Sequence, residues 1–296
     1  MSGAYLNLPP VNSRRAGSRF AILQAPYDAT STWKKGADRG PQAILDASAH
    51  LELYDIETDT EAYRAGIYTH EESLDLSSPQ RMVDSVEQLA APFYREGMIP
   101  VLLGGEHSVT LGAVRAAHAA HPDLAVLQLD AHTDLRAEYE GSPYNHACVM
   151  ARVSEICPIV QVGIRSMDLS EKSSVRKGRI FYARDIVHDT AWIDRVVGLL
   201  PEEVYLTFDL DVLDPSIMPS TGTPEPGGLG WYDCMRLLRR LARSRRIIGF
   251  DIVELCPGAQ HAPDFLAAKL VYKVMSYIHS SDEARRAGAA PMPGNP

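Results

Sequence analysis

Residues 98–134 read MIPVLLGGEHSVTLGAVRAAHAAHPDLAVLQLDAHTD. Two almost wholly apolar runs, at 98–103 and 124–129, lie on either side of a segment at 109–120 that we expect to be helical. Short apolar runs without alternation are typical of strands that are buried on both faces, as in parallel sheets. The stretch therefore predicts a strand, a crossover helix and a second parallel strand of an α/β protein.

The same alternation continues on both sides of this unit. Further strands are expected at 19–24, 158–164, 179–182, 204–208 and 247–253, and helices beginning at Pro41 and at 82–96, 192–200, 231–242 and 265–279. No internal repeat or linker divides the chain, so we expect one α/β domain over residues 1–296 with a mostly parallel central sheet. We expect about residues 1–15 to form a loose arm and 285–296 a loose tail.

The composition excludes several classes of protein. Of the 296 residues, 45% are hydrophobic and 23% are charged, which is ordinary for a globular chain. Lys and Arg number 29 against 38 Asp and Glu, without a basic block, so we expect no nucleic-acid partner. The sequence contains no run of about 18 apolar residues, which a membrane span would need, so we expect no membrane partner. The four cysteines form no CxxC pair, which indicates reduced thiols and a cytoplasmic protein.

Acidic and histidine side chains follow three of the expected strands. The six residues of this kind are His107, Asp130, His132, Asp134, Asp209 and Asp211. Because the carboxyl ends of parallel strands share one edge of a sheet, we expect these side chains to converge on one cleft. Four crowded carboxylates would repel one another, and two divalent cations would cancel their charge. Bridging by Asp130 and Asp209 would let six ligands hold two ions about 3.5–4 Å apart, and an oxygen-rich site with some imidazole favours Mn²⁺.

Five motifs in this order resemble those of the ureohydrolases, the arginase/agmatinase family. They are GGEHS at 104–108, DAHTDLR at 130–136, FDLDVLDP at 208–215, STGTPEPGG at 220–228 and GFDIVE at 249–254. The resemblance extends from the GADRGP segment at 36–41 to Glu254. It implies a three-layer α/β/α fold of the arginase/deacetylase type, two Mn²⁺ ions per subunit and a homotrimer or homohexamer. It also implies hydrolysis of a guanidino compound to urea and an amine.

The resemblance implies the two ligand sets as well. One Mn²⁺ would take His107, Asp130, Asp134 and Asp209, and the other would take Asp130, His132, Asp209 and Asp211. A hydroxide that bridges the ions would attack the guanidinium carbon, because binding to a metal lowers the pKa of water from 15.7 toward about 7.

Further positions match residues that bind substrate or move protons in this family. Glu254 would grip the planar fork of guanidinium N–H groups, which matches a carboxylate. Asp134 would pass a proton to the leaving amine. His146, in the PYNHA segment at 143–147, would contact the substrate and act as the proton shuttle. We expect Thr223 to line the site near Glu254, and Asp251 to be a supporting or structural residue.

The agmatinase branch of the family fits the sequence best. Ser166 stands where arginases commonly carry an acidic residue, and the loop at 135–145 lacks the Asn- and Ser-rich sequence of arginases. We therefore expect cleavage of agmatine to putrescine and urea, a step of polyamine biosynthesis. No residue of the sequence is identifiable as the partner of the distal amine of agmatine, and Ala147 replaces a glycine of many relatives. Arginine, guanidinobutyrate, guanidinopropionate and formiminoglutamate thus stay open as substrates.

Two other classes of protein agree less well with these motifs. A zinc deacetylase of the related fold would carry one metal and a tandem histidine pair, which the sequence lacks. A catalytically inactive binding homologue would be expected to have lost a metal ligand, whereas all six positions carry ligand-type residues.

Overall fold

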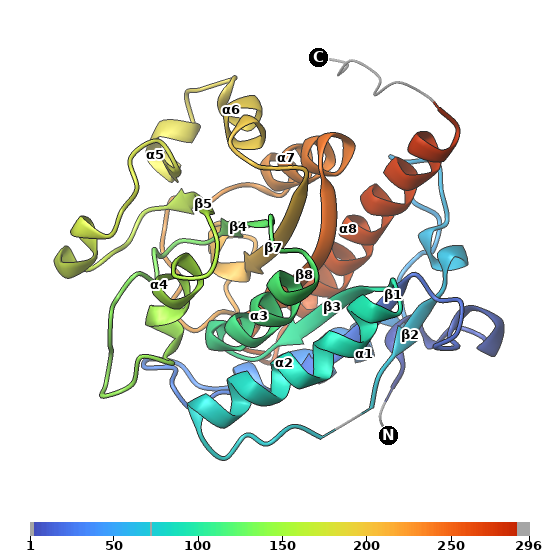
Figure 1. Ribbon diagram of the computed structural model, residues 1–296, viewed down its shortest axis with the longest axis horizontal. Helices are drawn as coiled ribbons and strands as arrows, with labels where there is room; N and C mark the ends of the chain where they lie inside the picture. Colours follow the sequence, from blue (N-terminus) through green and yellow to red (C-terminus); the bar gives the residue numbers. More distant parts are fainter. Residues whose placement is uncertain (1–2, 72, 289–296) are drawn as a thin grey trace.

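The computed structural model describes residues 3–71 and 73–288, and its centre is a sheet of parallel strands (Figure 1). The strands in this part of the chain are β1 (Phe20–Ala25), β2 (Ile67–Thr69), β3 (Ile99–Gly104), β4 (Ala125–Leu129), β5 (Ile159–Ile164), β6 (Ile180–Tyr182), β7 (Glu203–Asp209) and β8 (Arg246–Val253). They pair in the order β2-β1-β3-β8-β7-β4-β5-β6, and every pair is parallel. The predicted parallel sheet is confirmed.

Helices cover both faces of the sheet. They are α1 (Gly40–Ser48), α2 (Pro79–Arg95), α3 (Thr110–Ala120), α4 (Val149–Ser154), α5 (Ala183–Ile186), α6 (Trp192–Gly198), α7 (Trp231–Ser244) and α8 (Ala262–Arg286). Buried side chains of α1, α6, α7 and α8 pack against one face of the sheet, and those of α2, α3 and α4 pack against the other. The predicted three-layer α/β/α fold is therefore confirmed.

Burial on both faces explains the unbroken apolar runs of the sequence. In β1, Phe20 and Ile22 pack in one layer, while Ala21 and Leu23 pack in the other. Successive side chains of a strand point to opposite faces. A strand that is covered on both sides therefore needs an apolar residue at nearly every position.

The order of the strands in the sheet brings the polar segments of the sequence together. β3 and β4 follow one another along the chain, but β8 and β7 lie between them in the sheet. The carboxyl ends of β3, β8, β7 and β4 thus form one continuous edge. Each of these ends leads into one of the polar motifs, so the topology alone concentrates their side chains there.

The N-terminal segment is packed, so the expectation of a loose arm is wrong for residues 5–8. Tyr5 and Leu6 are buried. The Tyr5 hydroxyl donates a hydrogen bond to the Ala268 carbonyl at 2.7 Å, and the Leu6 N–H donates to Ser48 Oγ at 2.8 Å. A few apolar side chains in a polar segment are enough to fill the space beside α1 and α8.

The expected C-terminal tail is also partly wrong, because α8 extends to Arg286 and includes residues 285 and 286. The rest of that prediction, at 289–296, lies outside the described residues. β2, α4 and α5 were not expected, because elements of three, six and four residues carry too little periodicity to be recognised. No helix in the described part of the chain is long and apolar enough to cross a membrane.

Candidate metal centre and substrate cavity

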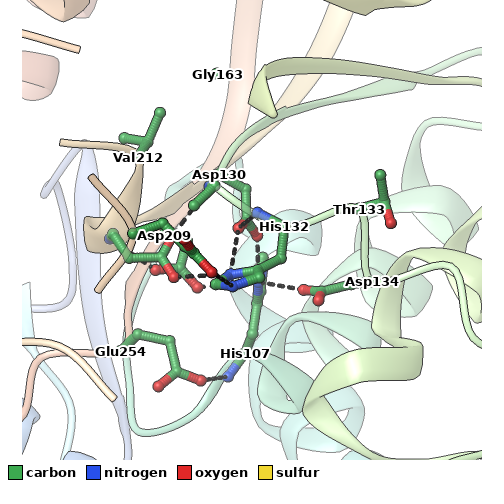
Figure 2. Close-up of polar contacts among 12 residues, drawn as sticks. His107, Asp130, His132, Thr133, Asp134, Gly163, Asp209, Val212 and Glu254 are labelled. Carbon is green, nitrogen blue, oxygen red and sulfur yellow. Dashed lines mark hydrogen bonds and ion pairs between the residues drawn. The ribbon is translucent and has the colours of Figure 1, made fainter. Parts of the chain in front are cut away.

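Four neighbouring strand ends supply the side chains of the candidate site. Figure 2 shows these side chains turned toward one another. His107 follows β3, and Glu254 follows β8. The segment after β4 carries Asp130, His132 and Asp134, and β7 ends in Asp209, with Asp211 in the helical turn Leu210–Val212. The structure therefore brings together all six predicted metal ligands and the predicted guanidinium-binding glutamate.

The first group of ligand atoms surrounds the imidazole of His107. Its Nδ1 lies 3.0 Å from Asp130 Oδ2, 3.1 Å from Asp134 Oδ2 and 3.3 Å from Asp209 Oδ2. This Nδ1 is buried and has no hydrogen-bond partner among the described residues. A buried, unpartnered nitrogen facing three carboxylate oxygens has the donor set and the crowding that a divalent cation would satisfy.

The second group consists of Asp130, His132 and Asp211. His132 Nδ1 lies 2.9 Å from Asp211 Oδ2 and 3.6 Å from Asp130 Oδ1. Asp130 belongs to both groups, as its predicted bridging role requires. Asp209 contacts the first group through Oδ2, while its Oδ1 accepts the Asp211 N–H at 2.9 Å.

Backbone groups hold the carboxylates in place. The His132 N–H donates to Asp130 Oδ1 at 2.6 Å, and the Ala131 N–H donates to Asp211 Oδ1 at 3.0 Å. Asp134 adopts a left-handed backbone with φ of 53°, which is uncommon for a residue other than glycine. Strained backbone of this kind is concentrated at functional sites. The close spacing in the DAHTD segment thus brings Asp134 to the first group, His132 to the second and Asp130 to both.

Burial and mutual repulsion shift the pKa values of this cluster strongly. Burial, followed by the charge of Asp130, raises the pKa of Asp134 to about 7. Burial also raises the pKa of Asp209 well above its usual value. For His132, burial opposes the charged form, but Asp211 and Asp130 outweigh it and raise the pKa to about 12. The carboxylates therefore attract positive charge to the cluster, and cations that bind there would release protons.

A chain of hydrogen bonds orients His107 from behind. His107 Nε2 lies 2.8 Å from Thr207 Oγ1, and that hydroxyl donates to Asp251 Oδ1 at 2.6 Å. Because the single hydroxyl hydrogen of Thr207 goes to Asp251, His107 Nε2 must be the donor to Thr207. In the neutral imidazole, the form that binds a metal, the lone pair of His107 is then on Nδ1, which faces the carboxylates. Asp251 acts on the site through Thr207, and Tyr205 OH holds its other oxygen at 2.9 Å.

We expect Thr207→Val to weaken Mn²⁺ binding about 10–100-fold, the usual effect of removing a residue that supports a metal-bound histidine. Valine keeps the shape of threonine but cannot accept the His107 N–H. The Mn²⁺ dissociation constant, measured by calorimetry, checks this, with Thr190→Val at an exposed position as the control. Equal affinity of the two variants would contradict the role of Thr207.

A cavity of about 270 Å³ opens above the two ligand groups. Besides the ligands and Glu254, its walls include Thr32, Arg136, Tyr139, His146, Ser166, Asp168 and Thr223. Glu254 is 8% exposed, and its Oε1 accepts the His107 N–H at 2.8 Å. Its backbone φ of 67° is again left-handed. The predicted substrate-binding residues Glu254, Thr223 and His146 therefore all line this cavity.

His146 begins the helical turn His146–Cys148, which Asn145 caps by accepting the Ala147 N–H. Burial is the main cause that lowers the pKa of His146, to about 4. The imidazole is therefore neutral at pH 7 and has one nitrogen able to accept a proton.

The sequence reasoning missed several residues that support the site. Gln161 Nε2 donates to Gln128 Oε1 at 2.6 Å, and Gln128 Nε2 donates to Asp130 Oδ2 at 2.7 Å. Arg165 Nη2 donates to the carbonyls of Asp211 at 2.6 Å and Glu225 at 2.8 Å, which ties two site loops together. The signal for the glutamines was a polar residue inside each of two buried apolar strands.

Gly163 is a point where only glycine fits. It has φ of 93°, and a Cβ there would lie 2.5 Å from Val212 Cγ2 (Figure 2). Val212 belongs to the same helical turn as Asp211. The missing side chain therefore lets β5 approach the segment that carries this ligand.

The sheet carries two groups of carboxylate and imidazole side chains at its carboxyl edge, beneath a cavity with a buried glutamate. These are the side chains that a metal-dependent hydrolase needs. The chain belongs to the arginase family, whose family model matches residues 18–276. Its relatives include ureohydrolases that are named for agmatine or for its aminopropyl derivative.

Relatives of this type cover almost the whole chain. An N(1)-aminopropylagmatine ureohydrolase of Synechocystis sp. is 39% identical over 282 residues, which cover 91% of this chain and 92% of that protein. An agmatinase of Pyrococcus horikoshii is 35% identical over 280 residues, with coverage of 91% and 95%. The crystal structure of the agmatine ureohydrolase of Thermoplasma volcanium matches with a TM-score of 0.82 and 30% identity, and covers 97% of this chain and 96% of that chain.

Proposed function

We propose that this ureohydrolase cleaves agmatine to putrescine and urea and uses two Mn²⁺ ions. The names of its relatives support an agmatine-type substrate, because they specify agmatine or its aminopropyl derivative. The observation that carries the proposal is the 270 Å³ cavity, which joins both ligand groups to the buried carboxylate of Glu254. A guanidinium in this cavity would be held by its N–H groups against Glu254.

The residues of the chain would divide the chemistry among them. When bound, the two cations supply a nucleophile at neutral pH by lowering the pKa of water. His107, Asp130, Asp134 and Asp209 would hold one cation, and His132 and Asp211 would hold the other together with Asp130 and Asp209. Glu254 would orient the guanidinium carbon toward them. Asp134 would then hold the proton that the leaving amine needs, and His146 would exchange protons with solvent.

Asp168 is our candidate for the amine of agmatine, a contact for which the sequence indicated no residue. It lines the cavity and is about half-exposed. Hydrogen bonds from Ser170 lower the pKa of Asp168, so it is ionised at pH 7. The other acids that line the cavity are the metal ligands, Glu254, and Glu171, which is buried and accepts from Thr133 Oγ1 and the Leu135 N–H. Among the described acidic residues that line the cavity, Asp168 is therefore the one that is not buried.

Arg136 also lines the cavity, but two carboxylates more than compensate its positive charge. Its guanidinium lies 4.0 Å from Asp168 Oδ2 and 4.0 Å from Glu171 Oε2 and stacks 4.3 Å from the centre of the Tyr139 ring. Two carboxylates against one guanidinium leave a net negative charge on this side of the cavity. Such a wall favours a substrate with a distal ammonium over one with a distal carboxylate.

Urea release by the Mn²⁺-loaded protein from five substrates side by side tests the proposal. They are agmatine, N(1)-aminopropylagmatine, arginine, guanidinobutyrate and guanidinopropionate. We expect the highest kcat/KM for agmatine. A higher kcat/KM for N(1)-aminopropylagmatine would indicate that this longer amine is the substrate. The highest kcat/KM for guanidinobutyrate would contradict the proposed amine specificity.

We expect Asp168→Asn to raise KM for agmatine about tenfold, since a charge-assisted hydrogen bond becomes a neutral one. KM for guanidinobutyrate should stay the same or fall, because that substrate has no ammonium. Steady-state kinetics with both substrates measures the difference, and Asp185→Asn, at an exposed position on α5, is the control. An equal rise of KM for both substrates would show that Asp168 only shapes the cavity.

We expect His146→Ala to lower kcat about 100-fold, at the low end of what a general acid or base contributes. Both Mn²⁺ ions should remain bound, because His146 is not in either ligand group. Added imidazole should restore part of kcat. Metal content and kcat with and without imidazole check this, and an unchanged kcat would rule out a shuttle at His146.

The oligomeric state and the location in the cell stay predictions. The family resemblance implies a homotrimer or homohexamer, which light scattering of the purified protein would test. The four cysteines are buried and free, in keeping with a reducing compartment such as the cytoplasm.

A further inference from the structure

Glu106 is a buried carboxylate beside the site that the proposed chemistry does not use. It is 0% exposed, although it directly precedes His107. Its oxygens accept hydrogen bonds from the Thr30 N–H at 2.9 Å, from Ser108 Oγ at 2.6 Å and from Thr30 Oγ1 at 2.7 Å. Ser31 Oγ adds a longer contact of 3.3 Å. Glu106 thus fixes the hydroxyl of Thr30 by bonds to both its backbone and its side chain.

Thr30 in turn contacts His146 at two points. The backbone N–H of His146 donates to Thr30 Oγ1 at 3.0 Å, and the ring Nδ1 of His146 lies 3.3 Å from the same oxygen. Thr30 and His146 are 116 residues apart in the chain. The Tyr139 ring meets the imidazole edge-on, with the ring centroids 6.3 Å apart. The ring of His146 is therefore held from two sides.

The number of hydrogens at Thr30 Oγ1 decides the tautomer of His146. The hydroxyl has one hydrogen, and the acceptors of Glu106 at 2.7 Å are closer to it than His146 Nδ1 at 3.3 Å. With that hydrogen directed to Glu106, Thr30 Oγ1 can only accept from the imidazole. His146 then carries its proton on Nδ1 and has its lone pair on Nε2.

We propose that Thr30, anchored by Glu106, is a positioning residue that fixes the ring and the tautomer of His146. The kinetic part of this inference rests on the proposed function, in which His146 exchanges protons. A defined tautomer matters there, because only an imidazole with a bare Nε2 can accept a proton at that atom. A carboxylate that fixes a histidine tautomer is a familiar arrangement, and here a threonine hydroxyl stands between the two.

A double-mutant cycle separates this role from simple support of the loop at 28–36. We expect Thr30→Val to lower kcat about tenfold at unchanged KM and Mn²⁺ content, and Thr30→Ser, which keeps the hydroxyl, to restore it. In the His146→Ala background, Thr30→Val should have no further effect, because the interaction has already been removed. An equal tenfold loss in both backgrounds would overturn the proposal.

The tautomer can be read directly, without any assay of activity. In protein with ¹⁵N-labelled histidine and bound Mg²⁺, which is diamagnetic, the ring nitrogens of His146 are assigned by their loss in His146→Ala. We expect a protonated Nδ1 and a bare Nε2. In Glu106→Gln, the new amide can donate to Thr30 Oγ1 and free its hydrogen for His146 Nδ1, so the tautomer should change. A proton on Nε2 in the unmodified protein would overturn the proposal.

The two readouts also distinguish its failure from that of the proposed function. If His146→Ala keeps normal kcat, the shuttle is wrong, and the NMR tautomer alone decides the role of Thr30. If His146→Ala loses activity but Thr30→Val does not, the shuttle stands and the positioning role is wrong.

Discussion

Replacing Asp209 by alanine is expected to strip metal from the protein and to lower urea release by more than about 100-fold, beyond the upper range for residues that only support a ligand. Each of the two carboxylate oxygens of Asp209 makes a separate contact. Its Oδ2 lies 3.3 Å from His107 Nδ1, and its Oδ1 accepts the Asp211 N–H at 2.9 Å. The substitution therefore removes one proposed ligand and releases the turn that positions another, Asp211. Metal content after desalting and kcat with agmatine measure the effect.

Asp185→Ala serves as the matched control for Asp209, because it removes an aspartate that is exposed and far from the ligand groups in the sequence. It should keep both ions and full activity. Two bound Mn²⁺ and normal turnover in Asp209→Ala would contradict the assignment of this residue as a ligand.

Glu254→Gln is expected to keep both ions and to lower kcat/KM about 10²–10³-fold, the range for removing one group that stabilises the transition state electrostatically. Glutamine can still accept the His107 N–H through Oε1, as Glu254 does at 2.8 Å. It cannot offer a second anionic oxygen to the guanidinium, so a bidentate, charge-assisted contact is lost. The combination of normal metal content and low kcat/KM distinguishes this variant from loss of a ligand.

The control for Glu254→Gln is Glu155→Gln, which changes a largely exposed glutamate. We expect it to match the unmodified enzyme in both metal content and kinetics. Normal kcat/KM in Glu254→Gln would mean that another group binds the guanidinium, and loss of metal would mean that Glu254 supports the ligand groups instead.

The fold could be predicted well because its strands are buried on both faces. Each of the seven expected strands lies within one residue of its predicted bounds. The missed strand, β2, has three residues at the edge of the sheet, where partial exposure breaks the apolar run. The order of the strands was beyond the reach of pattern reasoning, because no local signal shows that β7 and β8 insert between β3 and β4.

The candidate site, too, could be predicted from the sequence only in part. The predicted metal ligands stand in short motifs directly after strands. Their spacing, and the rule that parallel sheets bind ligands at the carboxyl ends of their strands, were enough to group them. Thr30 and Arg165 were not predicted, because each makes its contacts with distant parts of the chain. Thr30, for example, meets Glu106 and His146 at separations of 76 and 116 residues. Such contacts depend on how loops close over the sheet, and a single sequence contains no local signal for that.

We propose that two cations act together in one cavity to release urea. Titration of the metal-free protein with Mn²⁺, with urea release from agmatine followed at each addition, tests it most directly. The structure predicts that activity rises until two equivalents of Mn²⁺ per chain are bound and then stays constant, because Asp130 joins two ligand groups. Full activity at one equivalent, or two bound ions without urea release, would contradict the account.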